Sequence, residues 1–401
     1  MTTLAIDGGT QSFDRRLAPW PVFGADEVQA VGDVLRSGRV NYWSGSRGGE
    51  FEARFAAWVG CEFGVAVANG SLGLEFALRA LKVGDGDEVI VTARSFVASA
   101  GCIRNVGAHP VFADVDRDSQ NVTAESLAPR IGPRTKAIVV VHLAGWPARM
   151  DAILELARDH NLQTVEDCAQ AHGARLRENP VGSMGDIGVF SFCRDKIMST
   201  AGEGGMCTTS DPAVFESVWS YKDHGKSRAL ATAPHAGSQF RWLHAGAGTN
   251  GRMTEVQAAV GLRQLDKVDG WLAQRRRNAS RLREGLRQMS ALRIPWPSVE
   301  ETHAFYGFYV FVEREGLRSG WTRDRIVASI VAEGLPCFTG SCPEIYRETA
   351  FAEHPQANVR LPVAKELGET SLVLLVHPGI TLEDIDAMAE AVDRVMRAAT
   401  R

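Results

Sequence analysis

The chain has 401 residues, of which 45% are hydrophobic and 23% are charged, and its formal net charge is −4. This length predicts two domains, and the composition is ordinary for a globular protein. Acidic and basic residues are mixed along the chain, which argues against a nucleic-acid partner. The seven cysteines are odd in number and form no CxxC pair. This pattern argues against a disulfide framework and a zinc site, so we expect no metal.

The N-terminal sequence has no apolar stretch after a basic start, and no uncharged apolar run approaches the roughly 18 residues of a membrane span. We therefore expect a cytoplasmic protein with no membrane partner. Residues 1–20 are expected to form a flexible arm that ends in a Pro-Trp-Pro turn.

From residue 25 to residue 209, helical and strand-like patterns alternate. Helices are predicted at 25–35, 51–58, 71–81, 96–106 and 152–160. Apolar strands are predicted at 64–68, 88–92, 110–113, 137–143, 163–166, 188–192 and 205–209. Apolar strands that alternate with helices are typical of an α/β domain with a mainly parallel sheet.

The remaining third of the chain has a different order of elements. A long helical stretch, 253–289, is broken at Gly270 and is expected to link the domains. Its cluster Arg275-Arg276-Arg277 favours a solvated helix face. Strands predicted at 305–313 and 371–377 and helices at 323–333 and 382–398 indicate a smaller α+β domain. We place the large domain at 1–265 and the small domain at 266–401.

The segment 166–205 holds an acid, an amide, a serine and a lysine in a glycine-rich frame. Asp167 directly follows an apolar strand, and ligands gather beyond the carboxyl ends of strands in open α/β sheets. An acid there can keep a pyridine nitrogen protonated, as pyridoxal 5′-phosphate (PLP) requires, although a helix cap is the simpler role. Most lysines are solvated, but Lys196 lies among apolar residues, and its amine could form a Schiff base with the PLP aldehyde.

Five further residues could bind this cofactor. Gln170 could donate a hydrogen bond to the ring hydroxyl. Ser191, at a strand end, and the Gly70-Ser71 pair, which opens a helix, could bind phosphate. Phe96 could stack on the ring. The simpler roles are an exposed or capping Gln170, a helix cap at Ser71 and core packing of Phe96.

Nine motifs extend over nearly the whole chain. They are NYWSG at 41–45, NGS at 69–71, GDGDEVIV at 84–91, GAHPVFADVD at 107–116, TKAIVVVHLAGWP at 135–147, EDCAQAHGA at 166–174, FSFCRDK at 190–196 with AGEGG at 201–205, TNGRMTEVQAAVG at 249–261, and LVHPGIT at 375–381. In this combination the chain resembles the DegT/DnrJ/EryC1/StrS family of sugar aminotransferases.

The resemblance implies a fold-type I PLP-dependent transferase in which Lys196 and Asp167 are catalytic. Lys196 would form the Schiff base, and Asp167 would pair with the pyridine nitrogen. Asn250 would reach the phosphate bound by the neighbouring subunit, which implies a homodimer with shared active sites. The positions that it assigns to the cofactor are Gly70, Ser71, Phe96, Asp167, Gln170, Ser191, Lys196 and Asn250.

The implied reaction moves an amino group from L-glutamate or L-glutamine to a keto sugar, for an amino sugar of a surface polysaccharide or a secondary metabolite. A keto-cyclitol acceptor is one alternative. A second alternative is a PLP-dependent sugar dehydratase of the same fold, which belongs to a branch with His in place of Lys196. A third is a regulator without turnover. The sequence Cys193-Arg194-Asp195 departs from many members, which have an aromatic residue and a Pro or Asn there. The residues expected at the acceptor are Tyr42, Trp43, His172, His224, Lys226, Arg252 and Tyr346.

Overall fold

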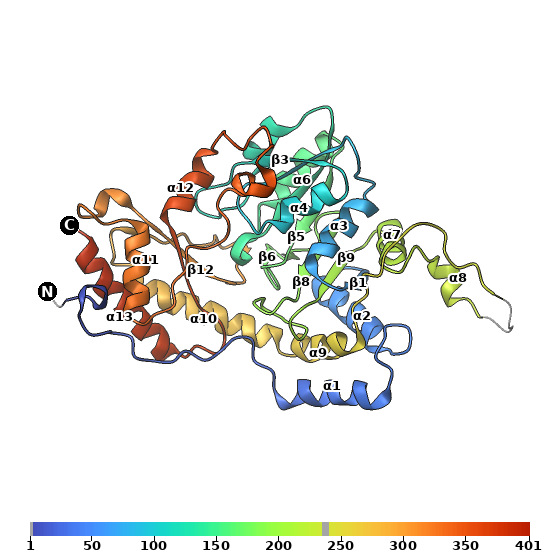
Figure 1. The fold of residues 1–401 in the computed structure, drawn as a ribbon, viewed down its shortest axis with the longest axis horizontal. Coiled ribbons are helices and arrows are strands. Elements are labelled where there is room, and N and C mark those ends of the chain that lie inside the picture. Colours follow the sequence, from blue (N-terminus) through green and yellow to red (C-terminus); the bar gives the residue numbers. More distant parts are fainter. Residues whose placement is uncertain (1–2, 235–239) are drawn as a thin grey trace.

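A seven-stranded sheet forms the centre of the larger unit in the computed structural model, which describes residues 3–234 and 240–401 (Figure 1). The strand order is β1-β9-β8-β5-β4-β2-β3. Strand β9 runs antiparallel to β1 and β8, and the other neighbouring pairs are parallel. The strands are β1 Phe63–Val67, β2 Glu88–Thr92, β3 His109–Ala113, β4 Thr135–Val141, β5 Gln163–Asp167, β8 Ile187–Ser191 and β9 Gly205–Thr209. The predicted α/β class with a mainly parallel sheet is confirmed.

Helices cover both faces of this sheet. Side chains alternate along each strand, so Val65 packs with the helices of one face and Ala66 with those of the other. The first face is covered by α3 Gly70–Ala80, α4 Ala98–Asn105 and α7 Pro212–Lys222, while α6 Met150–Asp159 packs against β5. The second face is covered by α2 Arg47–Val59 and α9 Glu255–Leu265, and α1 Ala25–Ser37 packs on α9.

The smaller unit is an antiparallel three-stranded sheet with three helices, which confirms the predicted α+β class. Its strands are β10 Leu292–Arg293, β12 Phe308–Val312 and β13 Ser371–Leu374, in the order β10-β12-β13. Its helices are α10 Val268–Leu286, α11 Arg323–Ala332 and α13 Leu382–Ala399. The remaining elements are α5 Ala124–Leu127, α8 Arg228–Thr232, α12 Pro362–Thr370 and a small sheet of β6 Arg175–Leu176, β7 Asn179–Pro180 and β11 Glu301–Thr302.

The prediction of a flexible N-terminal arm is wrong for the residues from Leu4 onward. Leu4 and Phe13 are buried in the core of the smaller unit, and the Glu333 carboxylate accepts hydrogen bonds from the backbone N–H groups of Ala5 and Ser12. Conversely, Ile345 and several residues after it, which lie between the smaller unit's strands β12 and β13 in the chain, pack into the core of the larger unit. The two cores therefore interlock across the boundary proposed between residues 265 and 266.

Two of the differences between predicted and observed element boundaries have a visible cause. The long helical stretch breaks at Asp266–Lys267, where the Lys267 amine bonds Glu27 of α1 at 2.6 Å, whereas Gly270 lies inside α10. The strand expected from residue 305 begins only at Phe308, because Phe305 has a φ of +48° and cannot be extended there.

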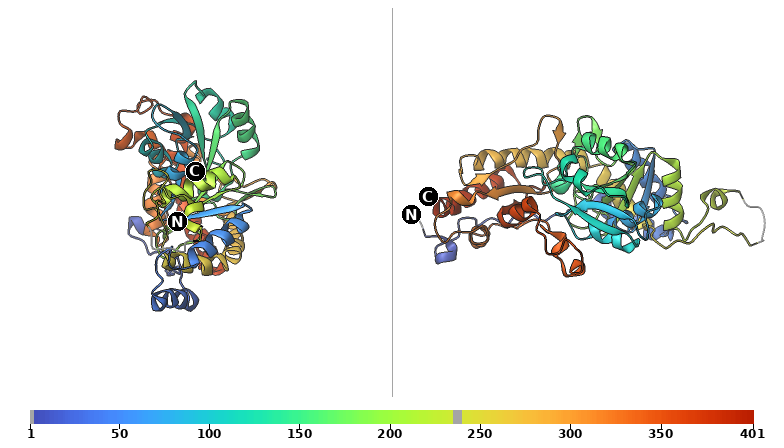
Figure 2. Two further views of the ribbon diagram at one scale, coloured as in Figure 1. Left: turned by 90° about the vertical axis from the view of Figure 1, so that its right-hand side faces the viewer. Right: turned by 90° about the horizontal axis from the view of Figure 1, so that it is seen from above.

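The segment that carries α8 projects from the larger unit, at the end of the molecule opposite to the two termini (Figures 1 and 2). None of the helices within residues 3–234 and 240–401 combines the length and apolarity that crossing a bilayer requires.

Candidate active site

The carboxyl ends of β5 and β8 meet the first turn of α3. A Cβ atom on Gly70 would lie 2.8 Å from the Cβ of Ser191, so only glycine permits this approach. A Cβ on Gly205 would likewise lie 2.8 Å from the backbone nitrogen of Gly70. The structure therefore brings Gly70 and Ser191 together, as the predicted phosphate site requires.

The first turn of α3 is capped by a residue other than the expected Ser71. The side chain of Asn69 accepts a hydrogen bond of 2.9 Å from the backbone N–H of Leu72. Ser71 is exposed in the first turn, so its hydroxyl is free to bind a ligand. Backbone N–H groups of a first helical turn have no partner within the helix, which suits a phosphate beside Gly70.

Asp167 ends β5 with a buried carboxylate. It accepts a hydrogen bond of 2.7 Å from the Ser99 hydroxyl and one of 3.2 Å from the backbone N–H of Ala169. Burial raises its pKa, and the bond from Ser99 only partly opposes this. Within the described part of the chain no cation forms an ion pair with it. A protonated pyridine nitrogen would supply the missing cation, so this carboxylate fits PLP.

Gln170 and Phe96 each leave a group that a ligand could contact. The carbonyl oxygen of the Gln170 side chain accepts the backbone N–H of Ala144 at 2.8 Å, which leaves its amide nitrogen to donate to a ligand. Phe96 precedes α4 and is 63% exposed, so it is not the core residue that its apolar character favoured. Its ring is free to stack on a planar ligand.

Lys196 lies in the loop between β8 and β9, and two distant segments contact it. Its amine donates to Asp195 Oδ2 at 3.2 Å and lies 5.0 Å from the ring centre of Tyr306. Its backbone carbonyl accepts a hydrogen bond of 2.9 Å from the Trp20 indole. The side chain is 14% exposed, while the apolar residues beside it in sequence lie in the core. Sequence reasoning missed Trp20 and Tyr306, because each lies more than 100 residues from the lysine in the chain.

The prediction that Arg275 lies on a solvated helix face is wrong. Arg275 is only 2% exposed, and its Nη1 donates to the carbonyls of Phe305 and Tyr306 at 3.2 and 3.4 Å. The guanidinium also lies 5.1 Å from the ring centre of Trp20. Burial lowers its pKa to about 9. Arg275 therefore ties α10 to the two segments that contact the lysine loop.

Five of the expected acceptor and interface residues gather around Asp223, at the end of α7. Lys226 and Arg252 donate to the same Asp223 carboxylate oxygen at 3.0 and 2.8 Å. The Lys226 amine also lies 4.4 Å from the ring centre of Trp43, which is 42% exposed. The remaining members of the group, both exposed, are His224 and Asn250.

Tyr42 points away from this group into a buried polar contact. Its hydroxyl donates to Glu52 at 2.8 Å, and the buried Lys222 amine lies 3.7 Å from its ring centre. Burial, reinforced by the Glu52 charge, raises the pKa of Tyr42. Tyr42 therefore stays neutral and supports the loop that carries Trp43.

His172 and Tyr346 lie in packed interiors rather than on a surface that an acceptor could reach. His172 is fully buried among Phe55, Phe190 and Phe192, and burial lowers its pKa to about 3. The Tyr346 hydroxyl accepts the backbone N–H of Leu361 at 2.9 Å, and the residue is fully buried. These positions correspond to packing roles, and neither residue is kept in the proposed acceptor site.

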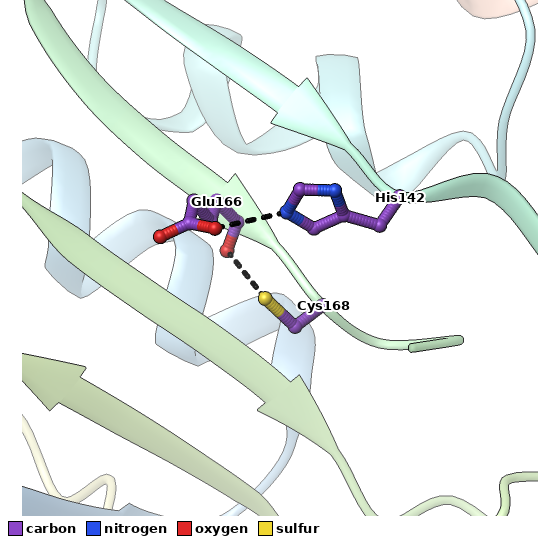
Figure 3. A group of neighbouring side chains, drawn as sticks. All are labelled: His142, Glu166 and Cys168. Atoms are coloured by element: carbon purple, nitrogen blue, oxygen red, sulfur yellow. Dashed lines mark hydrogen bonds and ion pairs between the residues drawn. The ribbon is translucent and has the colours of Figure 1, made fainter. Parts of the chain in front are cut away.

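His142, Glu166 and Cys168 form a buried cluster with metal-ligand chemistry (Figure 3). His142 Nδ1 accepts the backbone N–H of Ala148 at 3.0 Å, so its Nε2 carries the proton and donates to Glu166 at 3.0 Å. Although burial opposes it, the bonds from His142 and from backbone N–H groups lower the pKa of Glu166. The histidine has no free lone pair for a metal, so the cluster is structural.

An accessible lysine amine, a buried carboxylate that lacks a cation and a phosphate cradle at strand ends define a PLP-dependent enzyme of fold type I. The chain matches the model of the DegT/DnrJ/EryC1/StrS aminotransferase family over residues 21–393, and it belongs to that family. It is a PLP-dependent aminotransferase.

Relatives of known name support this assignment. The GDP-perosamine synthase of Caulobacter vibrioides is 37% identical over 348 residues, which cover 86% of this chain and 89% of that protein. A putative L-glutamine:3-amino-2,3-dideoxy-scyllo-inosose aminotransferase of Micromonospora echinospora is 34% identical over 415 residues, covering 98% and 96% of the two chains. The X-ray structure of an aminotransferase from Psychrobacter cryohalolentis superposes with a TM-score of 0.93 at 47% identity, covering 96% of this chain and 99% of that one.

Proposed function

We propose that the chain transfers an amino group from L-glutamate or L-glutamine to a keto sugar, for the synthesis of an amino sugar of a surface polysaccharide or secondary metabolite. The observation that carries the acceptor class is the group around Asp223. Two cations, Lys226 and Arg252, share one carboxylate oxygen, which leaves a net positive charge beside the exposed Trp43 ring. An aromatic face suits the apolar side of a sugar, and the excess charge suits an anionic group such as a nucleotide diphosphate.

The residues at the strand ends divide the work of the reaction. Bound PLP supplies an electron sink for the carbanion that forms at the donor α-carbon. Asp167 holds the positive charge on the ring nitrogen, and Gly70, Ser71 and Ser191 bind the phosphate. The Lys196 amine moves the proton that the donor α-carbon loses.

A homodimer completes the proposal. Asn250 is exposed beside Asp223, and by the family resemblance it reaches the phosphate of the neighbouring subunit. Each active site then contains residues of both chains. A cytoplasmic location remains part of the proposal.

The acceptor class is tested with protein that has been converted to its amine form with glutamate. Addition of a nucleotide-linked keto sugar or a free keto sugar should restore the absorbance of the aldehyde form, with formation of the amino sugar. The matched control is Lys196→Ala, which should lose the response by about two orders of magnitude or more. Restoration by pyruvate alone would reject the sugar acceptor.

A keto-cyclitol is the second candidate, and the relative from Micromonospora echinospora favours it. A keto-inositol in the same assay separates the two acceptors. The sugar dehydratase is disfavoured because Lys196 stands where that branch has His, and release of water without an amino product would support it instead.

A further inference from the structure

Asp195, which directly precedes the reactive lysine, has a carboxylate oxygen with two partners. The Lys196 amine donates to Asp195 Oδ2 at 3.2 Å, and the Tyr306 hydroxyl donates to the same oxygen. An exposed ion pair between chain neighbours is worth little by itself. The second partner changes this, because Tyr306 comes from a segment 111 residues away and fixes the carboxylate beside the amine.

The position of Tyr306 is itself held by several contacts. Its backbone N–H donates to the Ala144 carbonyl at 2.9 Å, and its own carbonyl accepts from Arg275. The preceding residue, Phe305, has a φ of +48°, a left-handed conformation that is unfavourable for a residue other than glycine. Such a conformation persists only when its surroundings hold it, and Arg275 also binds the Phe305 carbonyl.

Lys196 is held at both of its ends. The Trp20 indole donates to its backbone carbonyl, and Asp195 accepts from its amine. Three other residues that carry or could carry charge lie near this amine. They are Asp167 at the end of β5, Arg275 on α10, and His172, which is neutral because burial lowers its pKa to about 3.

We propose that Asp195 and Tyr306 form a holding site for the Lys196 amine after the amino donor has displaced it from the cofactor, with Asp195 as a catalytic residue. The proposal rests on Lys196 being the reactive lysine. In the half-reaction with the donor, the donor nitrogen would take the place of Nζ, and Nζ would receive the proton that leaves the donor α-carbon. The half-reaction with the acceptor would use the same proton transfer in the reverse direction. The resulting ammonium is stabilised beside the Asp195 carboxylate, and Tyr306 keeps that carboxylate in reach.

The test compares two rates in Asp195→Asn, a change that removes the charge and keeps the shape. Capture of PLP by the cofactor-free protein needs a neutral amine, so it is followed by absorbance across pH. Loss of the carboxylate should lower the pH midpoint of capture by about half a unit, which makes capture about threefold faster on the acid side. The half-reaction with glutamate should instead be about three- to tenfold slower.

Two further variants make the result specific. Tyr306→Phe removes the hydroxyl that shares the Asp195 carboxylate with the lysine. The carboxylate should then interact more strongly with the amine, so the pH midpoint of capture should rise, by less than the half unit expected for Asp195→Asn. Glu203→Gln changes an acid of the same loop that contacts Cys193 rather than the lysine, and its midpoint should match that of the unchanged protein. Equal midpoints in Asp195→Asn and Glu203→Gln, or a slowing of capture and half-reaction together, would overturn the proposal. PLP capture by Lys196→Ala with the same absorbance change would overturn the role of Lys196 itself.

Discussion

The phosphate cradle depends on the absence of one methyl group. A Cβ atom added to Gly70 would lie only 2.8 Å from the Cβ of Ser191. Because glycine lacks this atom, the first turn of α3 can approach the end of β8. This approach sets the distance between the backbone N–H groups of the turn and the Ser191 hydroxyl. The residue-scale requirement at this site is therefore steric.

Gly70→Ala should weaken PLP binding by about tenfold or more, because α3 must shift away from Ser191 to admit the methyl group. Equilibrium binding of PLP to the cofactor-free protein, followed by absorbance, measures this loss. Gly101→Ala is the matched control, since a Cβ there meets nothing within 4 Å. Equal PLP affinities in the two variants would show that the close approach does not form the phosphate site.

At the scale of elements, one carboxylate joins β4, β5 and the turn before β8. Glu166 of β5 accepts a hydrogen bond from Nε2 of His142, which follows β4. It also accepts hydrogen bonds from the backbone N–H groups of Gly182, Met184 and Gly185. The neighbouring residue Asp167 faces the cofactor site. The hydrogen bonds of Glu166 thus support the strand end from which Asp167 acts.

Glu166→Gln should destabilise the protein by about 2–4 kcal/mol at pH 7. The amide nitrogen of glutamine would face the N–H groups that now donate to the carboxylate, and at least one of them would lose its acceptor. The lowered pKa of Glu166 means that its contribution is present above the ordinary pKa of glutamate and is lost as the pH falls through the folded value. The acid-side fall in Tm should therefore be shallower in the variant. Thermal unfolding measures this when it is followed from pH 7 to well below pH 4, with the exposed Glu178→Gln as control. A slope equal to that of the control would contradict the prediction.

At the scale of the whole molecule, the N-terminal segment connects the two units. Leu4 and Phe13 pack in the smaller unit, and Trp20 reaches the lysine loop of the larger one. At the opposite end of the molecule, the segment with α8 projects from the larger unit (Figure 1). The N-terminal segment thus contacts the lysine loop of its own chain, and the segment with α8 lies at the other end of the molecule.

Mixing Lys196→Ala with Asn250→Ala protein should restore about a quarter of the unchanged activity, if Asn250 acts across a dimer. Half of the randomly formed dimers are then hybrids, and each hybrid has one complete site. Aminotransferase activity after subunit exchange measures the recovery. Mixing Lys196→Ala with the double variant should restore none. Absence of recovery in the first mixture, with exchange demonstrated, would mean that Asn250 acts within its own subunit.

The amino-acid sequence by itself determined the class of fold and the chemistry. The positions of the apolar strands, and of Asp167 and Ser191 at their ends, are set by residues a few positions away. Such local effects can be predicted from the pattern of apolar residues. The family motifs add Lys196 and its cofactor. The strand β2, Glu88–Thr92, agrees with prediction at both ends for the same local reason.

Only the tertiary structure decided what surrounds the lysine. Trp20 is 176 residues from Lys196 in the chain, and Tyr306 is 111 residues from Asp195. Arg275 has the sequence of an exposed helix face and yet is buried, because α10 packs beneath both segments. Contacts of this range leave no periodic pattern in the sequence. They arise when two cores interlock, which is a property of the folded chain alone.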